Sequence, residues 1–210
     1  MHVEDSISRI KSRLTWGVEH TTCSDNTMLI TSDPWARIHT IHMPTSGADF
    51  RNIEYLHELA HAVLAERHHL LATAWFMPGT PEMAYLKLTH SLRVASDWYA
   101  DDLLMEWAPN EERAEILEHV GYAGNIVRSD SEITYAGGLF FAQGVKYCGM
   151  KRQDIPRRYR KPAEILLGVD PGKPGVEAKR KLVNQLAALT CNVRIVLGND
   201  KGMDVWIVKQ

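Results

Sequence analysis

The sequence predicts an α+β fold. Three short segments with strand character lie near the N-terminus, several longer segments with helical spacing of apolar residues follow, and a strand–turn–strand pattern ends the chain. We expect a small N-terminal antiparallel sheet packed on two long helices, further helices, and a C-terminal β-hairpin. The 210 residues, 45% of them hydrophobic, suffice for a sizeable core.

The N-terminal elements follow from local patterns. Ile7, Ile10 and Leu14 have the spacing of a helix over residues 6–14. Three strands are expected next, at residues 15–21, 27–31 and 36–43. The third strand alternates apolar and polar residues, and Asp33-Pro34 marks a turn before it.

A helical period replaces the strand pattern at residues 49–70. Asp49 is a plausible N-cap, and the side of the helix to be buried is formed by Leu56, Leu59, Ala60 and Val63.

Further helices are expected at residues 81–107, 109–120 and 131–147. Thr80 would cap the first of them, with Pro81 in its first turn, and Gly121 would end the second. Gly137, Gly138 and Gly144 lower the helix propensity of the third.

The C-terminal part changes in character. Residues 151–161 are basic and polar, and residues 170–175 have the composition of a linker or exposed loop. A helix at 176–189 and a hairpin with strands at 193–197 and 205–208 complete the chain. We therefore expect a core at residues 1–150 and a smaller extension at residues 151–210.

Charge and cysteine content exclude several classes of protein. The net charge of −2 gives no general attraction to nucleic acids or membranes, and no run of 18 apolar residues exists. The N-terminus lacks the apolar stretch of a secretory signal. Cys23, Cys148 and Cys191 are odd in number and far apart, which argues against a disulfide framework. We expect a cytoplasmic protein without a membrane partner.

The stretch from His57 to His61 contains His-Glu-x-x-His within the helical pattern. Two histidines four residues apart differ by about 40° around a helix axis, so both imidazoles can reach one ion. Glu58 would flank that ion without binding it and could take a proton from metal-bound water. The alternative is a surface helix that carries two histidines by chance.

A catalytic zinc needs a third protein ligand. Asp97 and Asp101 share one face of the helix at 81–107; Asp97 would bind the metal, and Asp101 would orient a liganded histidine. A solvated acidic face is the alternative, His90 is another candidate ligand, and Asp102 is expected to be exposed.

These two motifs resemble the gluzincin branch of the zincin metallopeptidases. That branch usually has Glu-x-x-x-Asp on the second helix, whereas this chain has Asp97 in place of the glutamate, with Asp101 at the matching second position. The resemblance covers about 55 residues. The metzincin pattern fails because Arg67 stands where a third histidine is required, and His68 and His69 lie too far along the helix. Size and compartment also suggest the small intracellular, phage-associated ImmA/IrrE type, although no further motif identifies it.

The resemblance implies a zincin-like fold and a zinc-dependent peptidase. Zn²⁺ would be held by His57, His61 and Asp97, and Glu58 would assist attack of zinc-bound water on a peptide bond. The strand at residues 38–43 would be the edge beside the cleft, where an extended peptide or protein substrate pairs. No context selects an oxyanion-stabilising residue among Tyr99, His119 and Tyr135.

Two other functions stay open. One is a non-catalytic zincin-like module that binds a protein or nucleic-acid partner, and the other is a zinc hydrolase with a non-peptide substrate. The basic residues 151–161 could contact phosphates, although the sequence favours a solvated loop there. The oligomeric state does not follow from the sequence.

Overall fold

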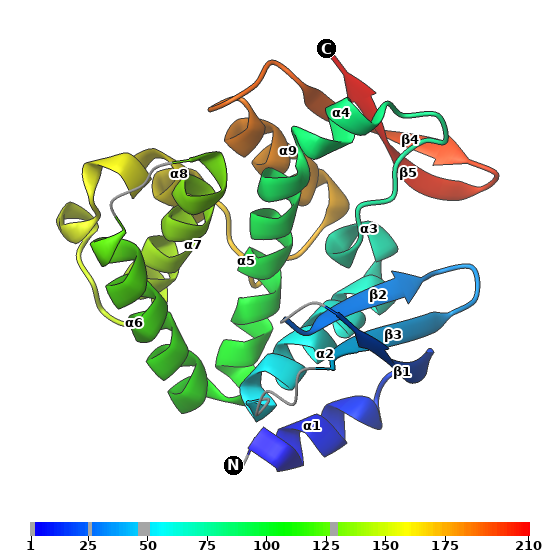
Figure 1. Cartoon of the computed structure of the whole chain (residues 1–210), viewed down its shortest axis with the longest axis horizontal. Coiled ribbons are helices and arrows are strands. Elements are labelled where there is room, and N and C mark those ends of the chain that lie inside the picture. The colour runs from blue at the N-terminus through cyan, green and yellow to red at the C-terminus, as the bar shows by residue number, and fades with distance from the viewer. Residues whose placement is uncertain (1–2, 25–26, 46–50, 127–129) are drawn as a thin grey trace.

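Two helices, α2 (Asn52–Arg67) and α5 (Thr89–Trp107), pack against each other near the centre of the fold. The structure is a computed structural model that describes residues 3–24, 27–45, 51–126 and 130–210. Figure 1 shows α5 in the middle, with the N-terminal sheet beside α2 and a group of helices on the opposite side of α5. The α+β class predicted from the sequence is confirmed.

The sheet consists of β1 (Gly17–Cys23), β2 (Leu29–Asp33) and β3 (Ile38–Pro44), in the order β1-β3-β2. β2 pairs antiparallel with β3, but β1 pairs parallel with it, so the predicted wholly antiparallel sheet is wrong. β2 and β3 form a hairpin, and β1 takes the remaining edge of β3. β1 runs parallel to β3, in the direction opposite to β2. No local sequence pattern shows which edge of a sheet a strand will occupy.

The helix α1 (Val3–Lys11) packs on α2. α2 begins after Arg51, while the predicted cap Asp49 lies outside the described residues. α2 ends before His68, whose backbone is extended, and the single-turn helix α3 (His69–Ala72) follows. The predicted helix to residue 70 is therefore interrupted near its end.

The predicted helix at residues 81–107 is split into α4 (Glu82–Leu86) and α5. Leu88 is fully buried whereas α4 has no buried residue, so the chain bends between the two helices to place Leu88 in the core. Thr80 does not cap α4, because its hydroxyl donates to the carbonyl of Met77 instead.

Four elements lie on the other side of α5: α6 (Pro109–Asn125), α7 (Ser131–Tyr147), η1 (Arg152–Asp154) and α8 (Arg157–Leu167). Gly121 does not end α6, which continues to bury Ala123. The glycines of α7 allow α8 to approach, because a Cβ on Gly137 would clash with Tyr159 and one on Gly138 with Pro162.

The basic residues at 151–161, which the sequence favoured as a solvated loop, belong largely to η1 and α8.

The C-terminal part contains α9 (Val176–Ala187), β4 (Arg194–Asp200) and β5 (Met203–Lys209). The β4–β5 hairpin is confirmed, with Lys201 and Gly202 at positive φ in its two-residue turn. Its Trp206 exchanges backbone hydrogen bonds with Trp75 and Met77, and α9 packs on α5. One hydrophobic cluster includes residues from both sides of position 150; the division into core and extension stays a prediction.

No helix among the described residues combines the length and apolar character needed to cross a membrane.

Candidate metal centre

Three side chains from α2 and α5 converge at one point. His57 and His61 are one turn apart on α2, and Asp97 faces them from α5. Leu56 and Leu59, on either side of His57, are fully buried, so the packing of α2 determines where the two imidazoles point. The predicted pair of helices therefore meets at the predicted residues.

The distances between the ligand atoms match a tetrahedral zinc site. Nε2 of His57 lies 3.0 Å from Nε2 of His61, and Oδ1 of Asp97 lies 3.3 Å from the latter and 3.9 Å from the former. Ligands about 2.0–2.1 Å from a tetrahedral zinc are about 3.3 Å from one another. These three residues could therefore hold a metal ion such as zinc, and the described residues would leave one tetrahedral position without a protein ligand.

Asp101 holds the His57 ring through Nδ1, the ring nitrogen that does not face His61 and Asp97. Nδ1 of His57 lies 2.8 Å from Oδ1 of Asp101, and the amide of the buried Gln143 donates to Oδ2 of the same carboxylate. With its proton on Nδ1, His57 presents the lone pair of Nε2 toward His61 and Asp97. Nδ1 of His61, by contrast, is buried with no partner among the described atoms.

The carboxylates make the centre favourable for a cation. Burial lowers the pKa of His57, but the charge and hydrogen bond of Asp101 outweigh it and raise that pKa well above the ordinary value. Burial also disfavours ionised Asp97, yet its hydrogen bond to His61 and the nearby His57 and Arg93 bring its pKa below the ordinary value. A proton or a metal ion is thus stabilised between these groups.

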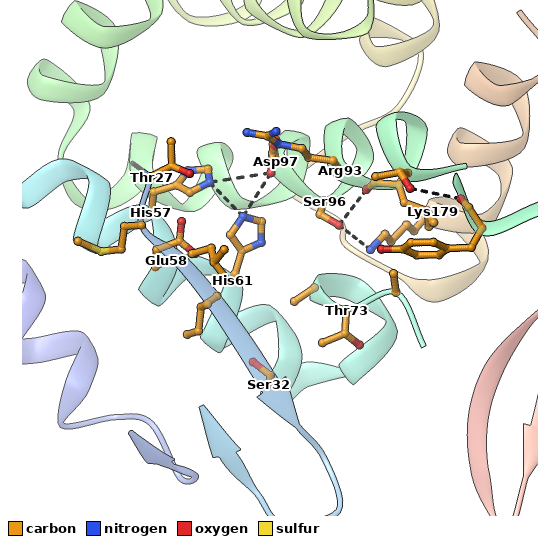
Figure 2. Close-up of a pocket in the computed structure, with 18 residues that line it drawn as sticks. Thr27, Ser32, His57, Glu58, His61, Thr73, Arg93, Ser96, Asp97 and Lys179 are labelled. Carbon is orange, nitrogen blue, oxygen red and sulfur yellow. Dashed lines mark hydrogen bonds and ion pairs between the residues drawn. The ribbon is translucent and has the colours of Figure 1, made fainter. Parts of the chain in front are cut away.

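Glu58 lies beside the centre and faces a cavity of about 460 Å³. Figure 2 shows it on α2 between His57 and His61. Its half-buried carboxylate makes no hydrogen bond or ion pair with any described residue, and so is available to accept a proton. This is the place expected for a general base that does not bind the metal.

The same cavity is lined by Lys179, a residue that the sequence analysis did not select. Its ammonium group is fully buried and donates to the carbonyl of Leu71 and to Oγ of Ser96, both at 2.7 Å. Figure 2 shows Lys179 beside Ser96. Burial lowers the pKa of Lys179 from 10.5 to about 7. Lys179 shares the buried face of α9 with Leu182, Val183 and Leu186, and this helical spacing could have indicated from the sequence that it is buried.

Three other side chains singled out in the sequence lie away from the centre. His90 does not belong to the His57–His61–Asp97 group, although it lines a neighbouring cavity. His68 and His69 bond to the side chain and backbone of Asp204 on β5, so they join the hairpin to α3, and neither belongs to the His57–His61–Asp97 group.

Asp102 is not the exposed residue that the sequence predicted. Its side chain is half-buried, accepts a hydrogen bond of 2.6 Å from the hydroxyl of Tyr147, and lies 3.8 Å from the Nζ atom of Lys146. Packing of α7 on α5 covers it, which the pattern of α5 alone does not reveal.

The strand beside the cavity is β2, not the predicted strand at residues 38–43. β3 is central in the sheet, whereas β2 is an edge and contributes Leu29, Ile30 and Ser32 to the cavity. His39 is buried between Ser32 and Glu66, and His42 bonds to Thr31. Neither histidine lines the cavity.

The three candidate oxyanion donors also lie outside this cavity. Tyr135 donates to the carbonyl of Leu186, and His119 stacks on Phe140. Tyr99 is buried, its hydroxyl has no partner among the described atoms, and burial raises its pKa to about 12. None of them lines the space beside Glu58.

Comparison with family models, curated proteins and solved structures finds no match to this chain. The interpretation of the centre therefore rests on its residues and geometry.

Proposed function

We propose that this protein is a zinc-dependent metallopeptidase. The observation that carries the proposal is the convergence of His57, His61 and Asp97 at the edge of a cavity that also holds Glu58, whose carboxylate is not paired with any described residue. A structural zinc site usually has four protein ligands, whereas this group offers three and opens onto the cavity. Zinc held there would act as a Lewis acid toward water and a carbonyl group.

The residues of the chain have distinct tasks in this reaction. Glu58 takes a proton from the attacking water and later delivers it to the leaving amine. Asp101 keeps the proton of His57 on Nδ1, so that Nε2 is available to the metal. Tyr99, Tyr135 and His119 are not assigned a role.

The edge strand beside the cavity supports an extended substrate. β2 has a free edge in the sheet and lines the cavity, so a peptide could pair with it as an additional strand. Such pairing would hold the backbone beside Glu58 and the metal ligands.

Metal analysis combined with peptidase assays tests the proposal. Purified protein should contain about one zinc per chain, and Glu58→Gln should keep the metal but lose peptide hydrolysis by at least about 100-fold. Glu54→Gln, on the same helix but paired with Arg51, is the matched control and should stay active. His61→Ala should lose the metal.

The results also separate the alternatives. Hydrolysis by Glu58→Gln within a few-fold of the wild type would refute the role of Glu58. A protein that retains zinc but cleaves no peptide in a proteome-derived library would instead be a binding module or a hydrolase of another substrate class.

A further inference from the structure

A second cavity, of about 320 Å³, adjoins the candidate metal centre. His57, Asp97 and Arg93 line both this cavity and the one that contains Glu58. The remaining walls come from α5, α6 and α7. Figure 1 shows α6 and α7 on the side of α5 opposite the β4–β5 hairpin. Both cavities are therefore bounded by residues of the candidate metal centre.

Much of the wall of the second cavity is apolar. The apolar side chains are contributed by all three helices and are those of Val94, Leu104, Ile116, Ala136, Leu139 and Phe140. Such a surface favours a hydrocarbon chain, because contact removes apolar area from water on both partners.

Glu112 places a buried carboxyl group on the wall of the second cavity. The residue is 4% exposed and lines the cavity, yet its carboxyl group makes no hydrogen bond or ion pair with any described residue. A buried carboxylate without a partner is costly, so a carboxyl group in this position favours either a proton or a bound cation. Burial, and secondarily the charge of Asp101, raises the pKa of Glu112 to about 9, in agreement with this cost.

The other acidic groups around the cavity already have partners or face solvent. Asp101 is occupied by His57 and Gln143. Oε1 of Glu115 lies 3.2 Å from the guanidinium of Arg51, whereas its Oε2 is buried with no partner among the described atoms. Glu132 is exposed.

The basic groups around the cavity leave Glu112 unpaired. The side chain of Arg93 is 70% exposed, and its Nε lies 3.9 Å from Oδ2 of Asp97. His119 stacks on Phe140, and His90 lies near the ring of Tyr135. Among the buried carboxyl groups of this cavity, Glu112 is therefore the one that has neither a hydrogen bond nor an ion pair with a described residue.

We propose that the second cavity binds a lysine or arginine side chain of the substrate, with its aliphatic part on the apolar walls and its cationic group on Glu112. The placement of that residue beside the cleaved bond rests on the proposed peptidase function. The affinity of the cavity for the side chain does not, because the apolar walls and Glu112 belong to α5, α6 and α7.

Binding of two small probes tests the cavity without any turnover. Calorimetric titration of the full chain, with and without added zinc, compares Nα-acetyl-lysine methylamide with Nα-acetyl-norleucine methylamide, which has a similar aliphatic chain but no amine. The lysine probe should bind at least about tenfold more tightly. Equal affinities in the wild type would overturn the proposal, whatever the behaviour of any variant.

Variants on α6 locate the effect. Glu112→Gln keeps the size of the side chain and should remove the preference for the lysine probe. Glu111→Gln makes the same charge change at an exposed position of the same helix and should preserve that preference. A preference that persists in Glu112→Gln, or a second equivalent of zinc bound through Glu112 in place of the probe, would overturn the assignment.

The two proposals can fail separately. Zinc-dependent cleavage of a peptide library without any preference for a basic residue near the cut would refute the cavity's role and leave the peptidase function standing. A lysine preference in binding, together with no cleavage of any peptide, would refute the peptidase function and leave the basic-side-chain cavity standing.

Discussion

The buried ammonium group of Lys179 predicts an unusual dependence of stability on pH. In the folded chain its pKa is about 7, against 10.5 for an ordinary lysine, and burial is the main cause. Between these two values the unfolded chain carries a proton on Lys179 that the folded chain does not. Raising the pH in this interval therefore destabilises the unfolded state and increases the free energy of unfolding.

The size of this effect follows from the shift in pKa. Each pH unit between the two pKa values changes the free energy of unfolding by about 1.4 kcal/mol, so a rise from about pH 7.5 to about pH 9.5 adds nearly 3 kcal/mol. Lys179→Met lacks this titration while keeping an aliphatic chain of similar length. The free energy of unfolding of the wild type minus that of Lys179→Met should therefore increase by about 3 kcal/mol over this range.

Urea denaturation at several pH values, in the presence of a chelator, measures the difference. Comparing two variants cancels the other titrating groups, and the chelator removes any metal contribution. Lys181→Met changes an exposed lysine on the same helix, so its difference from the wild type should stay constant. A constant difference for Lys179→Met as well would mean that the buried ammonium keeps its proton in the folded state, and the reasoning from burial would be wrong.

Three further predictions concern the support of the centre and the packing of the fold. Asp101→Asn should lower zinc affinity by about 10–100-fold in a chelator competition, because a neutral amide holds the His57 ring less firmly, and an unchanged affinity would contradict its orienting role. Glu66 accepts hydrogen bonds from the backbone of Thr15 and Trp16, which outweigh its burial and lower its pKa. Glu66→Gln should therefore cost about 2–3 kcal/mol of unfolding free energy at neutral pH, and this loss should shrink as the pH falls through the folded-state pKa of Glu66, as measured by denaturation at several pH values. Gly137→Ala should destabilise by more than about 1 kcal/mol because its Cβ would strike the buried Tyr159, whereas Gly121→Ala, in open space on α6, should stabilise by roughly 0.5–1 kcal/mol; thermal unfolding that ranks the two variants in the opposite order would refute this account.

The structure corrects the predicted position of the strand at residues 38–43 and the identity of the edge strand beside the cavity. The alternation of apolar and polar residues could determine neither. Residues 36–43 have the pattern of a strand, and the strand exists, but its place between β1 and β2 depends on pairing over distance. The free edge beside the cavity consequently belongs to β2. A strand's own residues specify which side chains share a face, whereas its neighbours are chosen by the packing of the whole sheet.

The helical periodicity of the sequence contains information on two buried charged residues, Lys179 and Glu112. Each occupies the buried stripe of its helix, Lys179 with Leu182 and Leu186, and Glu112 with Ile116. The pattern could have marked both as buried charged residues. What they contact could not be inferred, because Leu71 and Ser96 reach Lys179 from distant parts of the chain.

The sequence by itself determined the pairing of His57 with His61 and the position of Glu58 between them, because one helical turn sets those relations locally. The spacing of Asp97 and Asp101 likewise placed them on one face of α5. Only the tertiary structure decided that α5 packs on α2 so that Asp97 meets both histidines, and that α6 and α9 bring Glu112 and Lys179 to the adjoining cavities. The physical reason is that periodicity fixes directions within an element, while the burial of many apolar side chains at once fixes how elements are placed against one another.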